Sequence, residues 1–503
     1  RVTAAPVALL ATSGSAPAHW YPAVIEADQA GIPLVLLSAD RPLELQGCGS
    51  NQTIDQHRLF PQAVRAFHAL PAIVQHEQGQ AFVRSVAMRA VHQSCWPLPG
   101  PVHNNVPFHE PQREKTIPRL TPEGSAATVE LPTLMPPDAQ LDRIATRIAG
   151  QAGLIVCGPG RFGAEFAPSV TRLAEKLNCP LLADPLSGLR FGDHDRARIL
   201  CHYDAFLRRA AFCNRYRPQW VLRFGSMPVS RSLLHYLQHL QSGKLIVVDP
   251  YGRWPDPLHR TGEMLRATPQ AVCDGLAARI ACPTPDGWWE AFSRQEQVSA
   301  QLCHDLGVSG HWFEAQLVPA LLDRLPAGSL LFAGNSMPVR ELDSFSGQFE
   351  KPLQLVANRG ASGIDGHVSS LLGLASASAD GTTVAGLIGD LAFYHDMNGL
   401  LAAPDCNATL IIINNDGGGI FRYLPQAGLD AFERYWSTPT GLDFRHAADL
   451  YRLPFRRVGR ADEFQQALND SLSQQGVKII EAVINPQHSV ERHRAYWEAV
   501  CSD

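Results

Sequence analysis

Several features that mark particular classes of protein are missing from this 503-residue sequence. No apolar stretch approaches the roughly 20 residues that a membrane-spanning helix needs. The net charge of −5 gives no basic excess of the kind found on nucleic-acid-binding proteins. The eleven cysteines are scattered and include no C-x-x-C pair, which argues against a disulfide framework or a zinc cluster. We therefore predict a cytoplasmic protein that binds neither nucleic acid nor membranes.

What the sequence does contain is a regular alternation of strand-like and helix-like segments. Residues 6–11 read as a strand, residues 20–30 as a helix and residues 33–37 as the next strand. This β-α-β rhythm at short spacing is typical of a parallel, doubly wound sheet. We therefore predict an α/β protein.

Two stretches without apolar periodicity divide the chain, at residues 113–137 and 282–287. Between them, Asp138 is predicted to cap a helix that ends at Gly150, and later apolar runs predict further buried strands. The third region carries its own apolar runs, for example at residues 329–332 and 478–484. We predict three doubly wound, parallel-sheet domains of similar size, at residues 1–118, 119–285 and 286–503.

Two predicted strands of the third region end in polar residues. One ends at Gly389 and Asp390, and the other at Asn415, followed by Asp416 and the glycines 417–419. A right-handed crossover would bring these loops side by side. One carboxylate, one amide oxygen and a glycine carbonyl suit Mg²⁺, and glycines let the backbone approach a diphosphate. A plain Asn-Gly turn without a ligand is the alternative.

The order of these two loops is similar to the cofactor signature of thiamine-diphosphate enzymes. The resemblance implies that Asp390, Asn415 and the backbone of Gly417 hold Mg²⁺, or Mn²⁺, against the diphosphate of the cofactor. It also implies that Ile364 supports the bent shape of the cofactor. The remaining residues that it places at the cofactor are Gly389, Leu391, Ala392, Ile420, Phe421 and Leu424.

Further stretches narrow the resemblance. Residues 38–42 (SADRP), 49–53 (GSNQT), 334–336 (GNS) and 358–366 (NRGASGIDG) resemble the 2-succinyl-5-enolpyruvyl-6-hydroxy-3-cyclohexene-1-carboxylate (SEPHCHC) synthases of menaquinone biosynthesis. The resemblance covers nearly the whole chain and is weakest in the middle domain. It implies decarboxylation of 2-oxoglutarate, conjugate addition of the succinyl unit to isochorismate, and a homodimer or homotetramer.

Two dianionic substrates need fixed cations, and the guanidinium group of arginine binds carboxylates with two hydrogen bonds. Arg41, Arg340 and Arg359 each lie in a predicted loop at the end of a strand, within a matched motif. A solvated surface charge is the alternative for any one of them. The other predicted substrate residues are Asn51, Gln52 and Ser336.

A second interpretation rests on residues 158–163 (GPGRFG), which follow a predicted strand. This G-x-G-x-x-G pattern, with Asp184 after the next apolar run, matches the dinucleotide fingerprint of NAD- or FAD-dependent oxidoreductases. However, Pro159 removes one amide from the loop that would receive the pyrophosphate. Another thiamine-diphosphate carboligase is a further alternative, although small apolar oxoacids need fewer arginines.

The match to the family also suggests that the first domain is truncated. Residues 12–15 (TSGS) match a segment that in the family follows the glutamate which activates the cofactor. No glutamate occurs among residues 1–25, and Glu26 lies on the other side of the motif. We therefore expect about two βαβ-sized units, roughly 60 residues, upstream, and a chain that is inactive without them.

Overall fold

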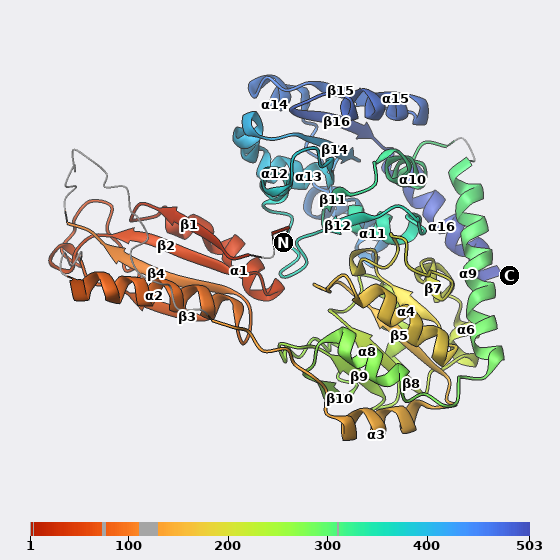
Figure 1. The fold of residues 1–503 in the computed structure, drawn as a ribbon. Coiled ribbons are helices and arrows are strands. Elements are labelled where there is room, and N and C mark those ends of the chain that lie inside the picture. Colours follow the sequence, from red (N-terminus) through yellow and green to blue (C-terminus); the bar gives the residue numbers. More distant parts are fainter. Residues whose placement is uncertain (1, 4, 73–76, 110–128, 309–310, 503) are drawn as a thin grey trace. The chain divides into compact units, whose positions relative to one another are not determined.

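The computed structural model describes the chain except for residues 1, 4, 73–76, 110–128, 309–310 and 503 (Figure 1). The described residues form three sheets, of four, six and six strands, and all strand pairs in them are parallel. The prediction of three parallel α/β domains is therefore confirmed. Two compact units account for the chain: Arg1–Pro132 with Asn358–Gly363, and Thr133–Ala357 with Ile364–Asp503. No helix among the described residues is both long and apolar enough to cross a membrane.

The first unit contains the four-stranded sheet, in the order β1-β2-β4-β3. The central strands β2 and β4 are mostly buried, whereas the edge strand β1 exposes Val7 and Leu10. The elements are β1 (Val7–Ala11), α1 (Tyr21–Ala30), β2 (Leu34–Asp40), β3 (Ala66–Ala69), α2 (Glu77–Cys95) and β4 (Pro101–Pro107).

The second unit begins with a six-stranded sheet in the order β10-β9-β8-β5-β6-β7. Alternate residues of its central strand β5 face different clusters: Leu154 and Val156 belong to one, Ile155 and Cys157 to the other. Apolar residues at every position suit a strand that is covered on both faces. The strands are β5 (Gly153–Cys157), β6 (Leu181–Ala183), β7 (Ile199–Leu200), β8 (Trp220–Phe224), β9 (Leu245–Val248) and β10 (Thr261–Leu265). The helices are α3 (Asp138–Ile148), α4 (Phe166–Leu177), α5 (Tyr203–Phe206), α6 (Ala210–Arg215), α7 (Arg231–Gln238), α8 (Pro269–Ala277) and α9 (Asp286–Val308).

The last sheet has the order β12-β11-β13-β14-β16-β15. Its strand order reverses between β11 and β13, and ligands of doubly wound sheets bind beyond the carboxyl ends of strands at such a point. The strands are β11 (Ser329–Ala333), β12 (Leu353–Val356), β13 (Val384–Gly389), β14 (Ala408–Asn414), β15 (Phe455–Val458) and β16 (Val477–Val483). The helices are α10 (Glu314–Arg324), α11 (Met337–Phe345), α12 (His367–Ala377), α13 (Asp390–Asp396), α14 (Arg445–Leu450), α15 (Ala461–Leu472) and α16 (Pro486–Ser502).

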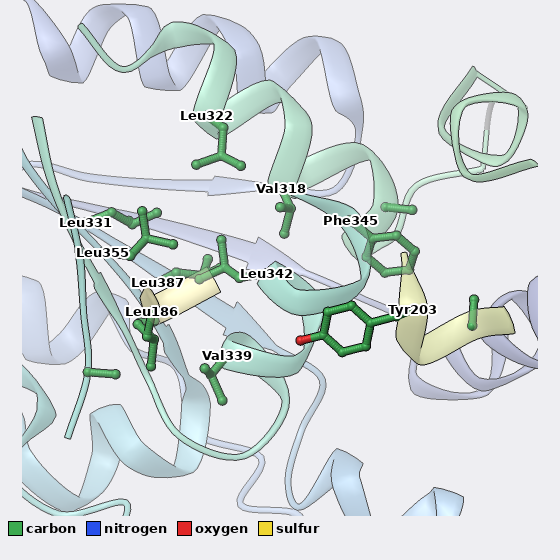
Figure 2. Close-up of a cluster of buried hydrophobic side chains, with 14 of the residues drawn as sticks. Leu186, Tyr203, Val318, Leu322, Leu331, Val339, Leu342, Phe345, Leu355 and Leu387 are labelled. Carbon is green, nitrogen blue, oxygen red and sulfur yellow. The ribbon is translucent and has the colours of Figure 1, made fainter. Parts of the chain in front are cut away.

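The two six-stranded sheets share one apolar core. Figure 2 shows Leu186 and Tyr203, which follow strands of the first of these sheets, in the same cluster as Val339, Leu342 and Phe345 of α11. Polar groups join the two sheets as well, because buried Arg190 donates to buried Asp343 at 2.5 Å. These two sheets therefore pack as a single unit.

The start of α3 differs from the prediction. Asp138 is the first residue of the helix, not its cap, and Pro137 occupies the cap position without a side-chain hydrogen bond. The carboxylate of Asp138 instead accepts a hydrogen bond from Arg279 at 2.5 Å. Of the predicted linker at residues 113–137, the part up to residue 128 lies outside the described residues, and residues 129–137 form neither helix nor strand.

A buried ion pair fixes the end of β7 against α9. Glu296 accepts hydrogen bonds from the backbone amide of Cys201 and from Nδ1 of His202, both at 2.8 Å. Burial alone would lower the pKa of His202, but the charge of Glu296 and the hydrogen bonds of the ring raise it to about 10. The pKa of Glu296 is lowered, because His202 outweighs the opposing effect of burial.

Replacing His202 by Gln should lower the free energy of unfolding by about 1.5–3 kcal/mol, the usual contribution of a hydrogen bond to a charged group. The contribution of the histidine is fully present below its unfolded pKa of 6.5 and is lost as the pH rises through about 10. The contribution of Glu296 requires a pH above its ordinary value of 4.5. Urea unfolding should therefore show the largest difference between wild type and variant at pH 4.5–6.5. A difference that is equally large at pH 10 would contradict a charged pair.

Candidate active site

The ends of β13 and β14 lie next to each other in the last sheet, where Gly389 is opposite Ile413. The backbone amide of Gly417 donates to Oδ2 of Asp390 at 2.7 Å. The two polar loops that the sequence predicts to meet are thus in direct contact. They lie beside the point where the strand order of this sheet reverses.

Asp390 opens α13 and is only 4% exposed. Its Oδ1 accepts a hydrogen bond from the amide of Leu391 at 2.7 Å, in addition to the bond from Gly417. Burial raises the pKa of Asp390 to about 6, even though both amides oppose this shift. At neutral pH the carboxylate is therefore mostly ionised in a buried place, where a cation would stabilise it.

The residues after β14 add a second hard oxygen and a closely packed backbone. The Oδ1 atom of Asn415 is buried and has no hydrogen-bond partner among the described residues. Gly417 has a φ of +131°, and a Cβ atom there would lie 2.1 Å from the carbonyl oxygen of Ser437. A buried carboxylate beside an unpaired amide oxygen fits a Mg²⁺ ion.

A strained turn follows β11, the strand beside β13. Ser336, the residue before α11, has a φ of +68°, which is uncommon for a residue other than glycine. Nη1 of Arg340, one turn into α11, donates to the carbonyl oxygen of Ser336 at 2.5 Å. The turn and the arginine side chain therefore support each other at the reversal point of the sheet.

A cavity of about 770 Å³ opens next to this turn, within the second unit. Arg340 lines it from α11, and Arg208 and Arg231 line it from elements that follow strands of the neighbouring sheet. Arg208 also pairs with Asp204 at 2.7 Å and stacks over Trp497. Asp204, Glu341 and Asp343 line the same cavity, so its wall carries both charges and the arginines mark the places where it can pair with a carboxylate of a ligand.

The sequence analysis did not identify Arg208 or Arg231. The sequence does contain a signal for Arg231, because this residue directly follows Ser230 in the loop after strand β8. The hydroxyl of Ser230 accepts a hydrogen bond from the amide of Leu233 and so caps α7. This is the same kind of strand-end loop that holds the predicted arginines. The family resemblance is weakest in the middle domain, so it did not point to Arg231.

The apolar residues predicted at the cofactor are divided between two surroundings. Ile420 and Leu424 line the cavity, whereas the ring of Phe421 packs against Trp436 at 5.4 Å between ring centroids. Ile364, just before α12, is 37% exposed and is not part of the cavity lining. Leu391 and Ala392 lie in the first turn of α13, directly after Gly389 and Asp390.

The other predicted substrate residues belong to the first unit. Arg41 directly follows β2 and Asn51 is exposed, whereas Gln52 donates to the carbonyl oxygen of Ser13 at 3.1 Å. Arg359 lies in the 358–363 segment, where the carboxylate of Glu26 accepts hydrogen bonds from the two following amides, at 2.9 and 2.7 Å. Glu26 thus holds the loop that carries Arg359.

A buried polar network in the first unit was missed by the sequence analysis. Asn105, at the end of β4, donates to Asp40 at 2.7 Å and accepts hydrogen bonds from Ser38 and Gln56 at 2.9 and 2.8 Å. Gln56 in turn accepts the amide of Gly14 at 2.9 Å. The network fixes the strand end that precedes Arg41. Its signal in the sequence is the run of polar residues at 103–105 within a buried strand.

The dinucleotide interpretation is not supported by the geometry of its loop. A Cβ atom on Gly158 would lie 1.8 Å from the carbonyl oxygen of Ser226, and the amide of Ser226 donates to Pro159 at 2.8 Å. Asp184 is fully buried, and its two carboxylate oxygens accept the amides of Leu186 and Val229 at 2.8 and 2.9 Å. The carboxylate that should bind a ribose is therefore occupied within the protein.

Comparison with known proteins identifies the family. Residues 137–333 match the family model "Middle domain of thiamine pyrophosphate", and residues 343–482 match "Thiamine pyrophosphate enzyme, C-terminal TPP binding domain". A SEPHCHC synthase of Dechloromonas aromatica is 41% identical over 485 residues, which cover 95% of this chain and 86% of that protein. The chain belongs to the SEPHCHC synthase family. Members from Geobacillus thermodenitrificans and Chloroflexus aurantiacus are 39% and 40% identical, each over 99% of this chain and 86% of the relative.

The fold is also found in a solved structure. The crystal structure of a benzoylformate decarboxylase from Polynucleobacter necessarius matches with a TM-score of 0.68, over 96% of this chain and 87% of that one. At 16% identity this similarity concerns the fold alone. Since SEPHCHC synthases are thiamine-diphosphate-dependent transferases of menaquinone biosynthesis, the predicted enzyme class, organic cofactor and pathway are confirmed.

Proposed function

We propose that the protein decarboxylates 2-oxoglutarate and adds the resulting succinyl unit to isochorismate, which gives SEPHCHC. The proposal rests on family membership together with one observation, the arginine-lined cavity beside the reversal point of the last sheet. Turnover of isochorismate with 2-oxoglutarate, thiamine diphosphate and Mg²⁺ by the full-length protein tests it. A protein that binds the cofactor but consumes a different oxoacid would indicate another carboligase.

Asp390, Oδ1 of Asn415 and the backbone carbonyl of Gly417 are proposed to hold Mg²⁺, or Mn²⁺, at the diphosphate. The buried carboxylate and the unpaired amide oxygen support this assignment. When bound, thiamine diphosphate supplies the nucleophile and the electron sink for decarboxylation. The proposal also includes a homodimer or homotetramer in the cytoplasm, with domains at residues 1–118, 119–285 and 286–503.

The remaining residues bind substrate and exclude water. Arg340 and Arg231 offset the negative charge of the substrate carboxylates in the cavity. Ile420 and Leu424 make its wall apolar, and a dry site favours loss of carbon dioxide from a carboxylate. The further residues that we propose for substrate binding are Arg41, Asn51, Gln52, Ser336 and Arg359.

Replacing Arg340 by Ala should lower kcat/KM for the dianionic substrates by about 30-fold or more, because a substrate carboxylate in the cavity loses its positively charged partner. Thiamine diphosphate should still bind within about twofold of wild type. Steady-state kinetics and a cofactor titration measure the two effects separately. Arg340→Lys retains the positive charge and should recover part of the activity.

The matched control is Arg172→Ala, which removes an exposed arginine that pairs with Asp274; neither residue lines the cavity. This control should behave like wild type. Unchanged kinetics for both substrates in Arg340→Ala would remove Arg340 from the proposed site.

A further inference from the structure

Three buried side chains that the proposed reaction does not use meet behind the wall of the cavity. They are Glu314 at the start of α10, Glu341 on α11 and His493 on α16, and each is at most 2% exposed. One ligand atom from each side chain lies within 4.8 Å of the other two. Glu341 and His493 also line the cavity. Two carboxylates and an imidazole are thus concentrated where water is largely excluded.

The hydrogen bonds of His493 fix the direction of its ring. Nδ1 lies 2.7 Å from the carbonyl oxygen of Ser489, which can only accept, so Nδ1 carries the proton and donates. Nε2 lies 2.9 Å from Oε2 of Glu341 and donates to it. Burial alone would lower the pKa of His493, but Glu341 raises it to about 9, so the metal-free ring is an imidazolium and a cation would take the place of its Nε2 proton. A backbone carbonyl that orients one ring nitrogen while the other faces carboxylates is the usual support of a metal-bound histidine.

The carboxylates are incompletely paired. Oε1 of Glu341 is buried and has no hydrogen-bond partner among the described residues. Oε2 of Glu314 accepts only a hydroxyl bond from Ser489, at 2.8 Å, among the bonds found for that atom. A buried carboxylate oxygen without a partner loses hydration that nothing replaces. Oε1 of Glu341 therefore lacks a partner, while the positive charge beside Oε2 comes from His493.

We propose that Glu314, Glu341 and His493 bind a divalent cation of the Zn²⁺ or Mn²⁺ class, at a site separate from the diphosphate metal. Two carboxylates and a neutral imidazole offset the two positive charges of such an ion, and mixed oxygen and nitrogen ligands suit these metals. Bonds of about 2.1 Å place tetrahedral ligand atoms about 3.4 Å apart, so small side-chain rotations would close the site. This inference does not depend on the proposed function.

Three protein ligands leave a coordination position open, as in metal sites that bind an exchangeable ligand. Because Glu341 and His493 line the cavity, that position is available to water or to a carboxylate entering the cavity. Arg340 is the neighbour of Glu341 in α11 and lines the same cavity. The ion would therefore cancel the negative charge of Glu314 and Glu341 next to Arg340, which lowers the repulsion of an anionic ligand.

Calorimetric titration of the full-length, chelator-treated protein with Zn²⁺ and, separately, with Mn²⁺ tests the proposal. Thiamine diphosphate is left out, so that the diphosphate site lacks the phosphate oxygens it needs. We expect one equivalent of Zn²⁺ or Mn²⁺ to bind to wild type and to Asp390→Asn. Glu341→Gln and His493→Gln should weaken this binding by at least about 100-fold, whereas Glu498→Gln, an exposed carboxylate on the same helix as His493, should not change it.

Thermal unfolding provides a second measurement that does not require equal stability of the variants. An ion that binds the native state should raise the unfolding temperature of wild type but not that of Glu341→Gln, each compared with its own metal-free form. Binding that survives in Glu341→Gln would show adventitious surface sites. That result, or a wild type that takes up neither metal, would overturn the proposal. Glu314, Glu341 and His493 would then form a hydrogen-bonded cluster that holds protons and no metal.

Discussion

Replacing Asp390 by Asn should abolish the Mg²⁺-dependent binding of thiamine diphosphate. The substitution removes the carboxylate that we propose as the only charged protein ligand of the ion. Losing a residue that merely supports a metal ligand typically lowers metal affinity by about 10–100-fold, and losing the ligand itself should cost more. We therefore expect a loss of at least about 100-fold. Calorimetry with the full-length protein, titrated with the cofactor at fixed Mg²⁺, measures it.

Asp416→Asn is the matched control, because it makes the same change of charge in the same loop. Asp416 is exposed, and its Oδ1 accepts the amides of Thr440 and Gly441 at 3.0 Å, which an asparagine oxygen can also do. Cofactor affinity should remain at the wild-type level in this variant. Equal affinities for Asp390→Asn and Asp416→Asn would rule out Asp390 as a metal ligand.

The loops of Asp390 and Asn415 could be predicted from sequence because each is a polar break after a buried apolar strand. Strands β13 and β14 are neighbours in the sheet and also consecutive strands in the chain, so the crossover rule places their ends together. The short span between them leaves few alternatives. The residue pattern and the topology of the sheet therefore both predict that the loops of Asp390 and Asn415 meet.

Strand β4 shows the opposite situation. Its residues 103–105 are polar, yet they are buried in the middle of the sheet. Asn105 is tolerated there because Ser38, Asp40 and Gln56 from other segments satisfy its side chain. Strand periodicity does not reveal such tertiary partners, so the polar run marks the strand as unusual but does not identify the residues that Asn105 bonds.

Glu314, Glu341 and His493 could not be predicted together for a related reason. They come from three helices that are far apart in the chain, and no short motif links them. Each single residue reads as one polar position on an amphipathic helix. Only the packing of α10, α11 and α16 within the second unit brings their ligand atoms within 4.8 Å.

Gly417 lies under two constraints that only a glycine can satisfy, so Gly417→Ala should have a large effect. The φ of +131° is strained for any residue with a side chain, and the added Cβ would meet the carbonyl oxygen of Ser437 at 2.1 Å. Strain and overpacking together should lower the free energy of unfolding by about 2–4 kcal/mol.

The change in Gly417→Ala should reach the cofactor as well. The amide of Gly417 donates to Asp390, and the amide of Gly418 donates to Ser437 at 2.6 Å, so moving this loop disturbs the proposed metal ligands. We expect cofactor affinity to fall by at least about 100-fold, as for Asp390→Asn. Urea unfolding and cofactor calorimetry measure the two effects.

Gly428→Ala is the control for Gly417→Ala. Gly428 lies in an exposed segment after the same strand, and a Cβ atom there meets nothing within 4 Å. Its stability and cofactor affinity should therefore match those of wild type. If Gly417→Ala lost stability but kept its cofactor affinity, the loop would be structural and the diphosphate metal would have to lie elsewhere. The opposite pattern, weak binding in a fully stable variant, would place the effect of the glycine at the cofactor itself.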